Sequence, residues 1–201
     1  MLENKILLAS KSPRRRELLK LICADFEVDS ADADEALPHN VSPSDAVLYL
    51  SKIKAQPFCG SEKTVIGADT VVAVDNEILG KPENAEHAFE MLSLLSGRQH
   101  SVFTGVTLLH GGKSKSFFCE TKVNFYELSK QEINDYIACG ECFDKAGAYG
   151  IQGKGSLFVS GICGDYFNVV GLPISALADT LEDEFDIKLL TGMSTAQKSH
   201  Q

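Results

Sequence analysis

The sequence of 201 residues lacks any long hydrophobic run. A helix needs about 20 consecutive apolar residues to cross a bilayer, and no stretch of this chain approaches that length. The apolar segment nearest the N-terminus, Ile6–Ala9, is too short for the core of a secretory signal, and no cleavage pattern follows it. These absences argue against a membrane-spanning helix and lead us to expect a cytoplasmic protein.

Basic residues are also fewer than acidic ones. The chain holds 19 lysines and arginines against 28 aspartates and glutamates, for a formal net charge of −9. A general nucleic-acid binder has the opposite balance. Residues 1–20 reverse it with six basic residues and two acidic ones, so they carry +4 and the rest of the chain carries −13. A compact cationic patch on an acidic protein favours a small anionic ligand over a long polyanion.

Two common cofactor motifs are missing. Six cysteines do not imply disulfides in a cytoplasmic chain, and the CxxC motif at 139–142 has no second pair to complete a zinc site. The glycine-rich stretch 145–155 fails as a phosphate-binding P-loop, because that pattern needs Gly at Ala148 and Ser or Thr at Gly155. We also find no Ser/His/Asp or Cys/His arrangement that would indicate a covalent mechanism.

The stretch Thr64–Val74 is the most informative part of the chain. It is apolar and β-branched almost throughout, as in a strand covered on both faces, yet it carries Asp69 in its middle. A carboxylate removed from water needs compensation from a cation, a metal ion or a set of hydrogen-bond donors. Asp69 is therefore a candidate catalytic residue. A structural ion pair, or a strand that ends early at Asp69, is the alternative interpretation.

A hairpin is expected after this strand, because a two-residue turn signal follows Val74. Pairing Val74 with Glu77 sets Lys81 opposite Thr70. Since side chains alternate along a strand, Lys81 meets Asp69 only if a bulge or a strong twist intervenes.

A helix start with unusual charge follows the first predicted strand, Ile6–Ala9. Ser12 suits the N-cap and Pro13 the first helical position, and arginines occupy positions 14–16. Each cation in a first turn opposes the helix dipole by about 0.3–1 kcal/mol. The placement makes sense if an anion docks among the arginines, the serine hydroxyls and the free backbone N–H groups. The alternative is a solvated basic face, to which at least one arginine belongs.

An acidic loop follows a short predicted strand at 26–29. Solvation explains most acids in such loops. The last two members, Asp34 and Glu35, also offer the hard oxygen ligands that Mg²⁺ prefers.

The remaining signals alternate between helix and strand. Helices are expected after the capping residues Ser42, Asn84 and Ser129 and over 173–185, and strands over 101–110 and 113–125. Strands and helices alternate at first, and then a long hairpin intervenes, which predicts an α/β fold with a mixed sheet. No repeat or linker divides the chain, so we expect one domain over 1–191 and a polar tail over 192–201.

Seven segments match the signatures of one protein family, in order from residue 8 to about 174. They are LASKSPRRRELL at 8–19, DE at 34–35, GADTVV at 67–72, ILGKP at 78–82, residues 100–106, DKAGAYGIQG at 144–153 and GDYFNVVGLP at 164–173. On these motifs the chain resembles the Maf family of nucleoside triphosphate pyrophosphatases.

The resemblance implies an elongated mixed sheet flanked by helices, two lobes around a central cleft, and a homodimer. It implies that Asp69 is the catalytic proton acceptor and that Glu35 and Asp69 hold a divalent cation, Mg²⁺ or Mn²⁺. The residues that it implies in substrate binding and specificity are Ser10, Ser12, Arg14, Arg15, Lys54, Thr70, Lys81 and Gln152.

The family divides by base preference. Arg14, Thr70 and Gln152 match the branch that acts on dTTP and UTP, whereas the branch that acts on methylated GTP has an acidic residue at the position of Gln152. The resemblance therefore implies hydrolysis of dTTP and UTP to the monophosphate and pyrophosphate. The net charge of −9 argues against a nucleic-acid partner, and the lack of a long apolar run argues against a membrane partner. The alternatives are the same reaction on modified nucleotides such as methylated GTP, or a non-catalytic nucleotide-binding regulator of cell division.

Overall fold

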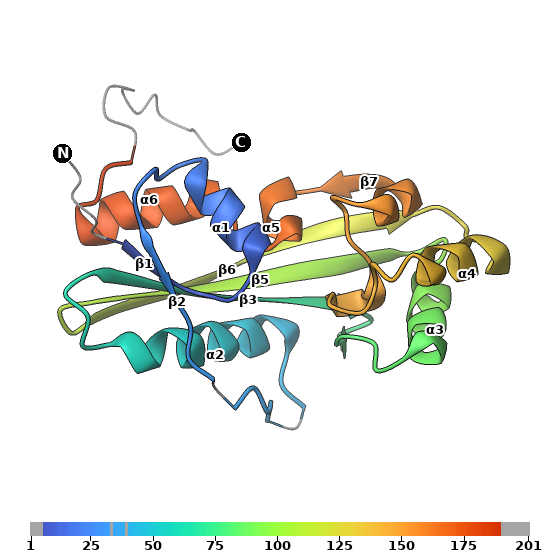
Figure 1. The fold of residues 1–201 in the computed structure, drawn as a ribbon, viewed down its shortest axis with the longest axis horizontal. Helices are drawn as coiled ribbons and strands as arrows, with labels where there is room; N and C mark the ends of the chain where they lie inside the picture. The colour runs from blue at the N-terminus through green and yellow to red at the C-terminus, as the bar shows by residue number, and fades with distance from the viewer. Residues whose placement is uncertain (1–5, 33, 39, 190–201) are drawn as a thin grey trace.

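The computed structural model describes residues 6–32, 34–38 and 40–189. A mixed sheet of seven strands runs along the described part of the chain, with helices on both of its faces (Figure 1). No described helix is both long and apolar enough to cross a membrane. The polar tail predicted at 192–201 lies outside the described residues.

The elements follow the predicted order closely. The strands are β1 (Ile6–Ala9), β2 (Glu27–Asp29), β3 (Thr64–Val74), β4 (Glu77–Leu79), β5 (Gln99–His110), β6 (Lys113–Phe125) and β7 (Val159–Cys163). The helices are α1 (Pro13–Lys20), α2 (Pro43–Ala55), α3 (Ala85–Leu95), α4 (Lys130–Ala138), α5 (Tyr166–Val170) and α6 (Ile174–Phe185), with short 3₁₀ helices at Gln56–Phe58, Ala146–Ala148 and Lys154–Phe158.

The predicted helix caps are confirmed. The side chains of Ser12, Ser42, Asn84 and Ser129 each accept a hydrogen bond from the backbone N–H three residues farther on. Each bond satisfies a donor that a helix start would otherwise leave unpaired. Among the described strands and α-helices, β7 and the five-residue α5 were not predicted, and neither were the three short 3₁₀ helices.

The sheet has the order β2-β1-β3-β5-β6-β7, with β4 paired to β3. β1 runs parallel to both β2 and β3, and the other pairs are antiparallel. The predicted mixed sheet is therefore confirmed.

One edge of β3 is uncovered for four residues. β1 pairs with residues 64–67 and β4 with residues 72–74, while β5 pairs with residues 65–73 along the opposite edge. Among the described strands, none covers residues 68–71 on the first edge. Asp69 and Thr70 lie in this opening. Because side chains alternate along a strand, these two side chains point toward opposite faces of the sheet.

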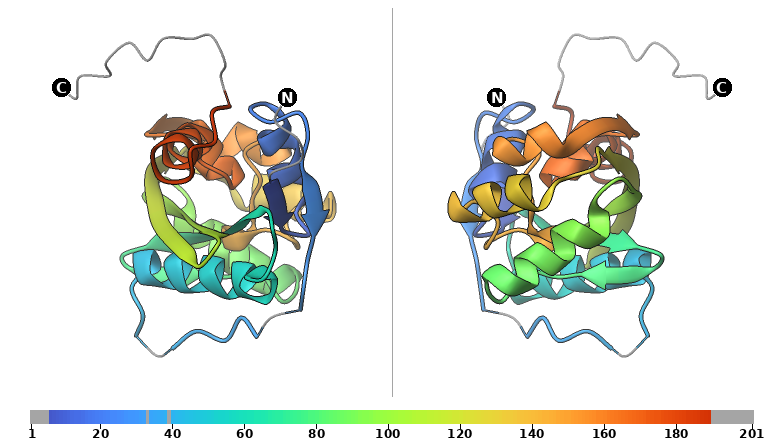
Figure 2. Two further views of the ribbon diagram at one scale, coloured as in Figure 1. Left: turned by 90° about the vertical axis from the view of Figure 1, so that its left-hand side faces the viewer. Right: turned by 90° about the vertical axis from the view of Figure 1, so that its right-hand side faces the viewer.

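The face that bears Asp69 packs closely against α2. A Cβ atom on Gly67 would lie 2.4 Å from the carbonyl oxygen of Ser51, and one on Gly105 would lie 2.3 Å from that of Val47. Glycine is needed at both positions for α2 to lie directly on β3 and β5. The other face carries α1, α5 and α6, which pack on it through a buried apolar core (Figure 2).

Two large apolar cores divide the molecule along its length. One joins α1 and α6 to the sheet, and the other joins α3 and α4 to the far ends of β5 and β6. In Figure 1, α6 lies on the left, and α3 and α4 lie on the right. The elongated, two-lobed α/β fold expected from the sequence is confirmed.

Candidate active site

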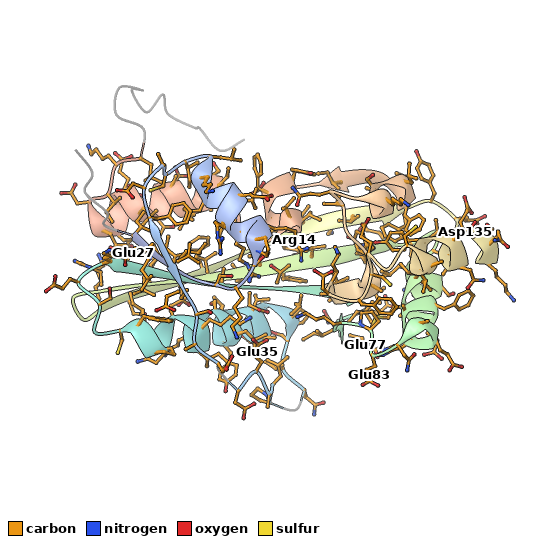
Figure 3. The ribbon with its side chains drawn as sticks, viewed as in Figure 1. Arg14, Glu27, Glu35, Glu77, Glu83 and Asp135 are labelled. Atoms are coloured by element: carbon orange, nitrogen blue, oxygen red, sulfur yellow. The ribbon has the colours of Figure 1, made fainter. Side chains whose placement is uncertain are left out.

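A cleft of about 910 Å³ opens at the uncovered edge of β3. The start of α1, the loop before α2, the end of α2, the loop after β4 and the segment 141–153 contribute to its walls. Figure 3 shows Arg14 and Glu35 near the middle of the long axis, on either side of the sheet. The cleft contains all ten residues proposed from the sequence, namely Ser10, Ser12, Arg14, Arg15, Glu35, Lys54, Asp69, Thr70, Lys81 and Gln152. Their individual roles stay predictions.

The cation that compensates Asp69 comes from α2. Asp69 is only 8% exposed, and its Oδ1 forms an ion pair with Lys54 Nζ. The same nitrogen lies 3.2 Å from Glu35 Oε1. β3 and β4 pair regularly from Val74 to Val72 without a bulge, and Lys81 is exposed beyond the end of β4. Lys54 therefore takes the place beside Asp69 that a bulged hairpin would have given to Lys81.

The two alternative interpretations of Asp69 have different outcomes. β3 continues to Val74, so the interpretation of a strand that ends at Asp69 is wrong. The ion pair exists, but its two side chains remain 12% and 19% exposed, and both line the cleft. The pair therefore faces the cleft and is compatible with catalysis.

The start of α1 forms the cationic wall of the cleft. The backbone N–H of Ser12 donates to Ser10 Oγ at 3.2 Å, and no acidic residue lies in the first turn to offset its arginines. Arg14 reaches across the cleft to Asp144, with Nη1 3.4 Å from Oδ2. Arg16 is exposed and lies outside the cleft lining, which matches the solvated alternative.

Arg15 is already bound to protein acceptors. Its Nε donates to the carbonyl oxygen of Gly171 at 2.9 Å and its Nη2 to Thr70 Oγ1 at 3.0 Å. Thr70 Oγ1 in turn lies 2.9 Å from Thr104 Oγ1 on β5. Burial lowers the pKa of the Arg15 guanidinium. These contacts favour a role in fixing Thr70 and α1 over the direct phosphate contact predicted for Arg15.

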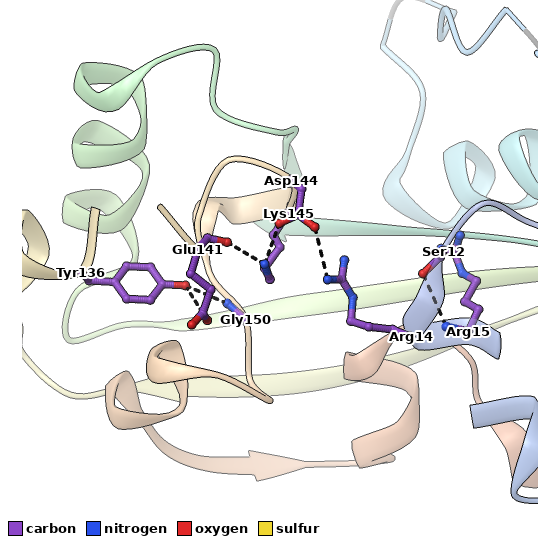
Figure 4. A network of polar contacts seen from close by, with 8 residues as sticks. All are labelled: Ser12, Arg14, Arg15, Tyr136, Glu141, Asp144, Lys145 and Gly150. Atoms are coloured by element: carbon purple, nitrogen blue, oxygen red, sulfur yellow. Dashed lines mark hydrogen bonds and ion pairs between the residues drawn. The ribbon is translucent and has the colours of Figure 1, made fainter. Parts of the chain in front are cut away.

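The wall opposite α1 holds residues that were not singled out from the sequence. Lys145 Nζ donates to Asp144 Oδ1 and to the carbonyl oxygen of Glu141, both at 2.6 Å. Figure 4 shows these contacts continuing through Asp144 to Arg14. The signal that could have found Lys145 is its place in the DKAGAYGIQG segment, seven residues before Gln152.

A buried histidine supports the floor beside this wall. His100 is 2% exposed, and its Nε2 lies 2.8 Å from the hydroxyl of Tyr149, which lines the cleft. Burial lowers the pKa of His100 to about 4 and raises that of Tyr149. Both groups are therefore neutral near pH 7.

Two carboxylates converge on one positively charged nitrogen, because Asp69 and Glu35 both pair with Lys54 Nζ. Mg²⁺ is commonly held by one or two carboxylates together with waters and substrate phosphates, and this pair fits that donor set. Within 6–32, 34–38 and 40–189, no three His, Cys, Asp or Glu side chains gather as a metal cage. A metal ion here would therefore need further oxygen ligands from substrate and water.

The fold and the cleft define an α/β protein suited to a phosphorylated small molecule, with a cationic helix start facing a carboxylate–lysine pair. A family model described as "Maf-like protein" matches residues 5–184. The chain therefore belongs to the Maf family.

Curated relatives extend this match over nearly the whole chain. A protein of Bacillus cereus strain ATCC 14579 named "dTTP/UTP pyrophosphatase" is 50% identical over 186 residues, which cover 92% of this chain and 97% of the relative. A protein of the same name from strain B4264 is 49% identical over the same share of each chain.

A solved structure also shows a partial similarity. The Staphylococcus aureus Ham1 protein is similar over 60% of this chain and 71% of its own, with a TM-score of 0.44 and 17% sequence identity. The family assignment does not depend on this partial likeness.

Proposed function

We propose that this protein hydrolyses dTTP and UTP to the nucleoside monophosphate and pyrophosphate. The observation that carries the proposal is Asp69, a nearly buried carboxylate that Lys54 holds at the open edge of β3. The names of relatives about 50% identical support the substrate class. The cationic start of α1 supports a polyphosphate in the same cleft.

In the proposed reaction, Asp69 takes a proton from water. The water oxygen bonds to the α-phosphorus as the bond from that phosphorus to the bridging oxygen breaks. Pyrophosphate leaves with the bridging oxygen and its electron pair, and the monophosphate remains. Lys54 orients the Asp69 carboxylate, while Arg14 and Lys81 bind the phosphate oxygens. Positioning and charge stabilisation then supply the rate, without a covalent intermediate.

We propose that Glu35 and Asp69 also hold a divalent cation, Mg²⁺ or Mn²⁺, when substrate is present. Such an ion polarises phosphate oxygens and neutralises charge that develops during the reaction. The two carboxylates supply the protein's part of the donor set, and Lys54 pairs with both of them.

Gln152 is proposed to select the base. It is exposed at the cleft wall, and its amide carries one acceptor and one donor group. That pair matches the O4 acceptor and N3–H donor of uracil and thymine, and cytosine reverses the pattern. A glutamate at this position would offer acceptors only, so it would suit a base that presents donors or positive charge. Where a bound base encloses the amide, a base that leaves its donor and acceptor unpaired is disfavoured.

The test is a side-by-side comparison of kcat/KM, measured as pyrophosphate release from dTTP, UTP, CTP, ATP, GTP and methylated GTP. We expect dTTP and UTP to be hydrolysed best and Gln152→Glu to erode that preference. Gln56→Glu makes the same change at an exposed position outside the cleft and should leave the preference intact. If methylated GTP or ATP exceeded both dTTP and UTP, the proposed base preference would be wrong. Binding of all nucleotides without turnover would favour the regulator instead.

On the family resemblance alone, we further propose that the enzyme works as a homodimer in the cytoplasm. Light scattering during size-exclusion chromatography tests the dimer. A dimer should have about twice the 21.8 kDa mass of one chain. A monomer at all accessible concentrations would contradict it.

A further inference from the structure

The loop that carries Gln152 is fastened to the end of α4 by one carboxylate. Glu141 Oε2 accepts a hydrogen bond from the backbone N–H of Lys154 at 2.9 Å, and Glu141 Oε1 accepts one from the Tyr136 hydroxyl at 3.1 Å. That hydroxyl also accepts the backbone N–H of Gly150 at 3.2 Å. Glu141 and Tyr136 therefore hold the loop on both sides of Gln152. Figure 4 shows the contacts of the Tyr136 hydroxyl with Glu141 and Gly150.

The glycines of this segment let the carboxylate lie against the chain. A Cβ atom on Gly153 would come within 2.3 Å of both carboxylate oxygens of Glu141. One on Gly155 would lie 3.0 Å from the Tyr136 hydroxyl and 2.8 Å from the carbonyl oxygen of Gly150. A side chain at 153 would therefore displace Glu141. The glycine-rich run that fails as a P-loop is explained by this close packing.

The protonation of Tyr136 suits this arrangement. Burial, and then the nearby charge of Glu141, raise the pKa of the Tyr136 hydroxyl. The hydroxyl thus keeps its proton near pH 7 and donates it to Glu141, while its oxygen accepts from Gly150. Each partner has one defined hydrogen-bonding role, which sets a single loop conformation.

We propose that Glu141 is a positioning residue for base selection, because it fixes the loop that presents the Gln152 amide. The inference rests on the proposed function. An amide turned over by half a rotation exchanges its donor and acceptor and then matches cytosine instead of uracil. Discrimination between the two bases therefore depends on where the amide meets the base edge, and the backbone of the loop sets that position.

The readout is the ratio of kcat/KM for UTP to kcat/KM for CTP. Glu141→Gln keeps the shape of the side chain but leaves it one acceptor atom for two donors, the Lys154 N–H and the Tyr136 hydroxyl. We expect the ratio to fall by about tenfold, the effect of one hydrogen bond to a charged group. We expect the loss mainly in KM, and Tyr136→Phe, which frees the same loop at Gly150, should lower the ratio in the same direction.

Glu132→Gln is the matched control. Glu132 lies in the first turn of the same helix, accepts hydrogen bonds from Ser129, and is not among the residues that line the cleft. This variant should melt at a lower temperature yet keep the wild-type ratio. If it lowered the ratio as much as Glu141→Gln, the effect would come from general loosening of α4, and the proposal would be wrong.

The decisive experiment introduces Glu141→Gln into a protein that already carries Gln152→Ala. If Glu141 acts through Gln152, the UTP/CTP ratio of the double variant should equal that of Gln152→Ala alone. Additive effects, or an unchanged ratio in a folded Glu141→Gln protein, would overturn the inference while UTP turnover still supported the proposed function. A wild-type protein without UTP turnover would instead refute the proposed function itself.

Discussion

Replacing Asp69 with asparagine tests the reaction at its proposed base. Asparagine has nearly the same shape as aspartate, so β3 and its pairing with β5 at Gly105 should persist. The amide oxygen can still accept from Lys54, but it cannot take a proton from water. Loss of a general base lowers a rate by about 10²–10⁴-fold. We expect kcat to fall by that factor.

The structure also limits how much stability the change should remove. Truncating one member of a buried ion pair costs about 3–5 kcal/mol. Here Lys54 keeps Glu35 at 3.2 Å, and both members of the pair with Asp69 retain some exposure. We therefore expect a loss of about 1.5–3 kcal/mol, the range of a hydrogen bond to a charged group.

The assay follows pyrophosphate release from saturating UTP, with nucleotide binding measured separately by calorimetry. Asp75→Asn is the control, because Asp75 is an exposed carboxylate at the end of the same hairpin, paired with Arg98. It should keep its activity, and Asp69→Asn should still bind nucleotide. More than half of wild-type activity in Asp69→Asn would refute the assignment of the base.

Three further predictions follow from the same structure. Arg14→Ala should raise KM for UTP and change the free energy of unfolding by no more than about 1 kcal/mol, because Arg14 opposes its helix dipole and its pair with Asp144 is partly exposed. If calorimetry showed marked destabilisation of this variant while its kinetics stayed normal, Arg14 would be a structural residue. Chelation should stop turnover until Mg²⁺ or Mn²⁺ is restored, and full activity after exhaustive chelation would contradict the metal role of Glu35 and Asp69. Burial lowers the pKa of His100 to about 4 in the folded protein, against 6.5 for the free side chain. Between these pH values the imidazole is protonated in the unfolded chain and neutral in the folded one. The free energy of unfolding should therefore fall by as much as about 3 kcal/mol as the pH drops from 6.5 to 4. Denaturant titrations of wild type and His100→Gln check this, and equal pH slopes would count against it.

The sequence predicted best those features that depend on residues close together in the chain. The cap at Ser12 with Pro13 behind it, and the capping box of Ser129 and Glu132, each involve only four successive positions. The limits of β3 were predictable because every residue of this central strand is at least partly buried, which leaves a continuous apolar run.

The partner of Asp69 was harder to predict, because it depends on how α2 lies on the sheet. The hairpin suggested Lys81, which is nearer to Asp69 along the chain than Lys54 is. In the structure, Lys54 pairs with Asp69 instead. A signal was present in α2. Lys54 lies one helical turn after the buried Leu50, so its stem follows the face that packs on the sheet.

The missed elements lack a local pattern. β7 is an edge strand with an exposed or half-buried residue at every position and a glycine in its middle, so neither alternation nor an apolar run marks it. α5 has five residues and starts at the cap Asp165. Contacts of Glu141 with the Gln152 loop depend on turns at Gly140 and Gly147, whose positive φ angles no periodic pattern reveals.

Hydrolysis of UTP in ¹⁸O-labelled water tests the central claim most directly. Mass spectrometry of the products identifies both the bond that breaks and the phosphorus that water attacks. Attack of water on the α-phosphorus predicts one UMP and one pyrophosphate for each UTP consumed, with the label on UMP. UDP and orthophosphate as products, or the label on pyrophosphate, would contradict it.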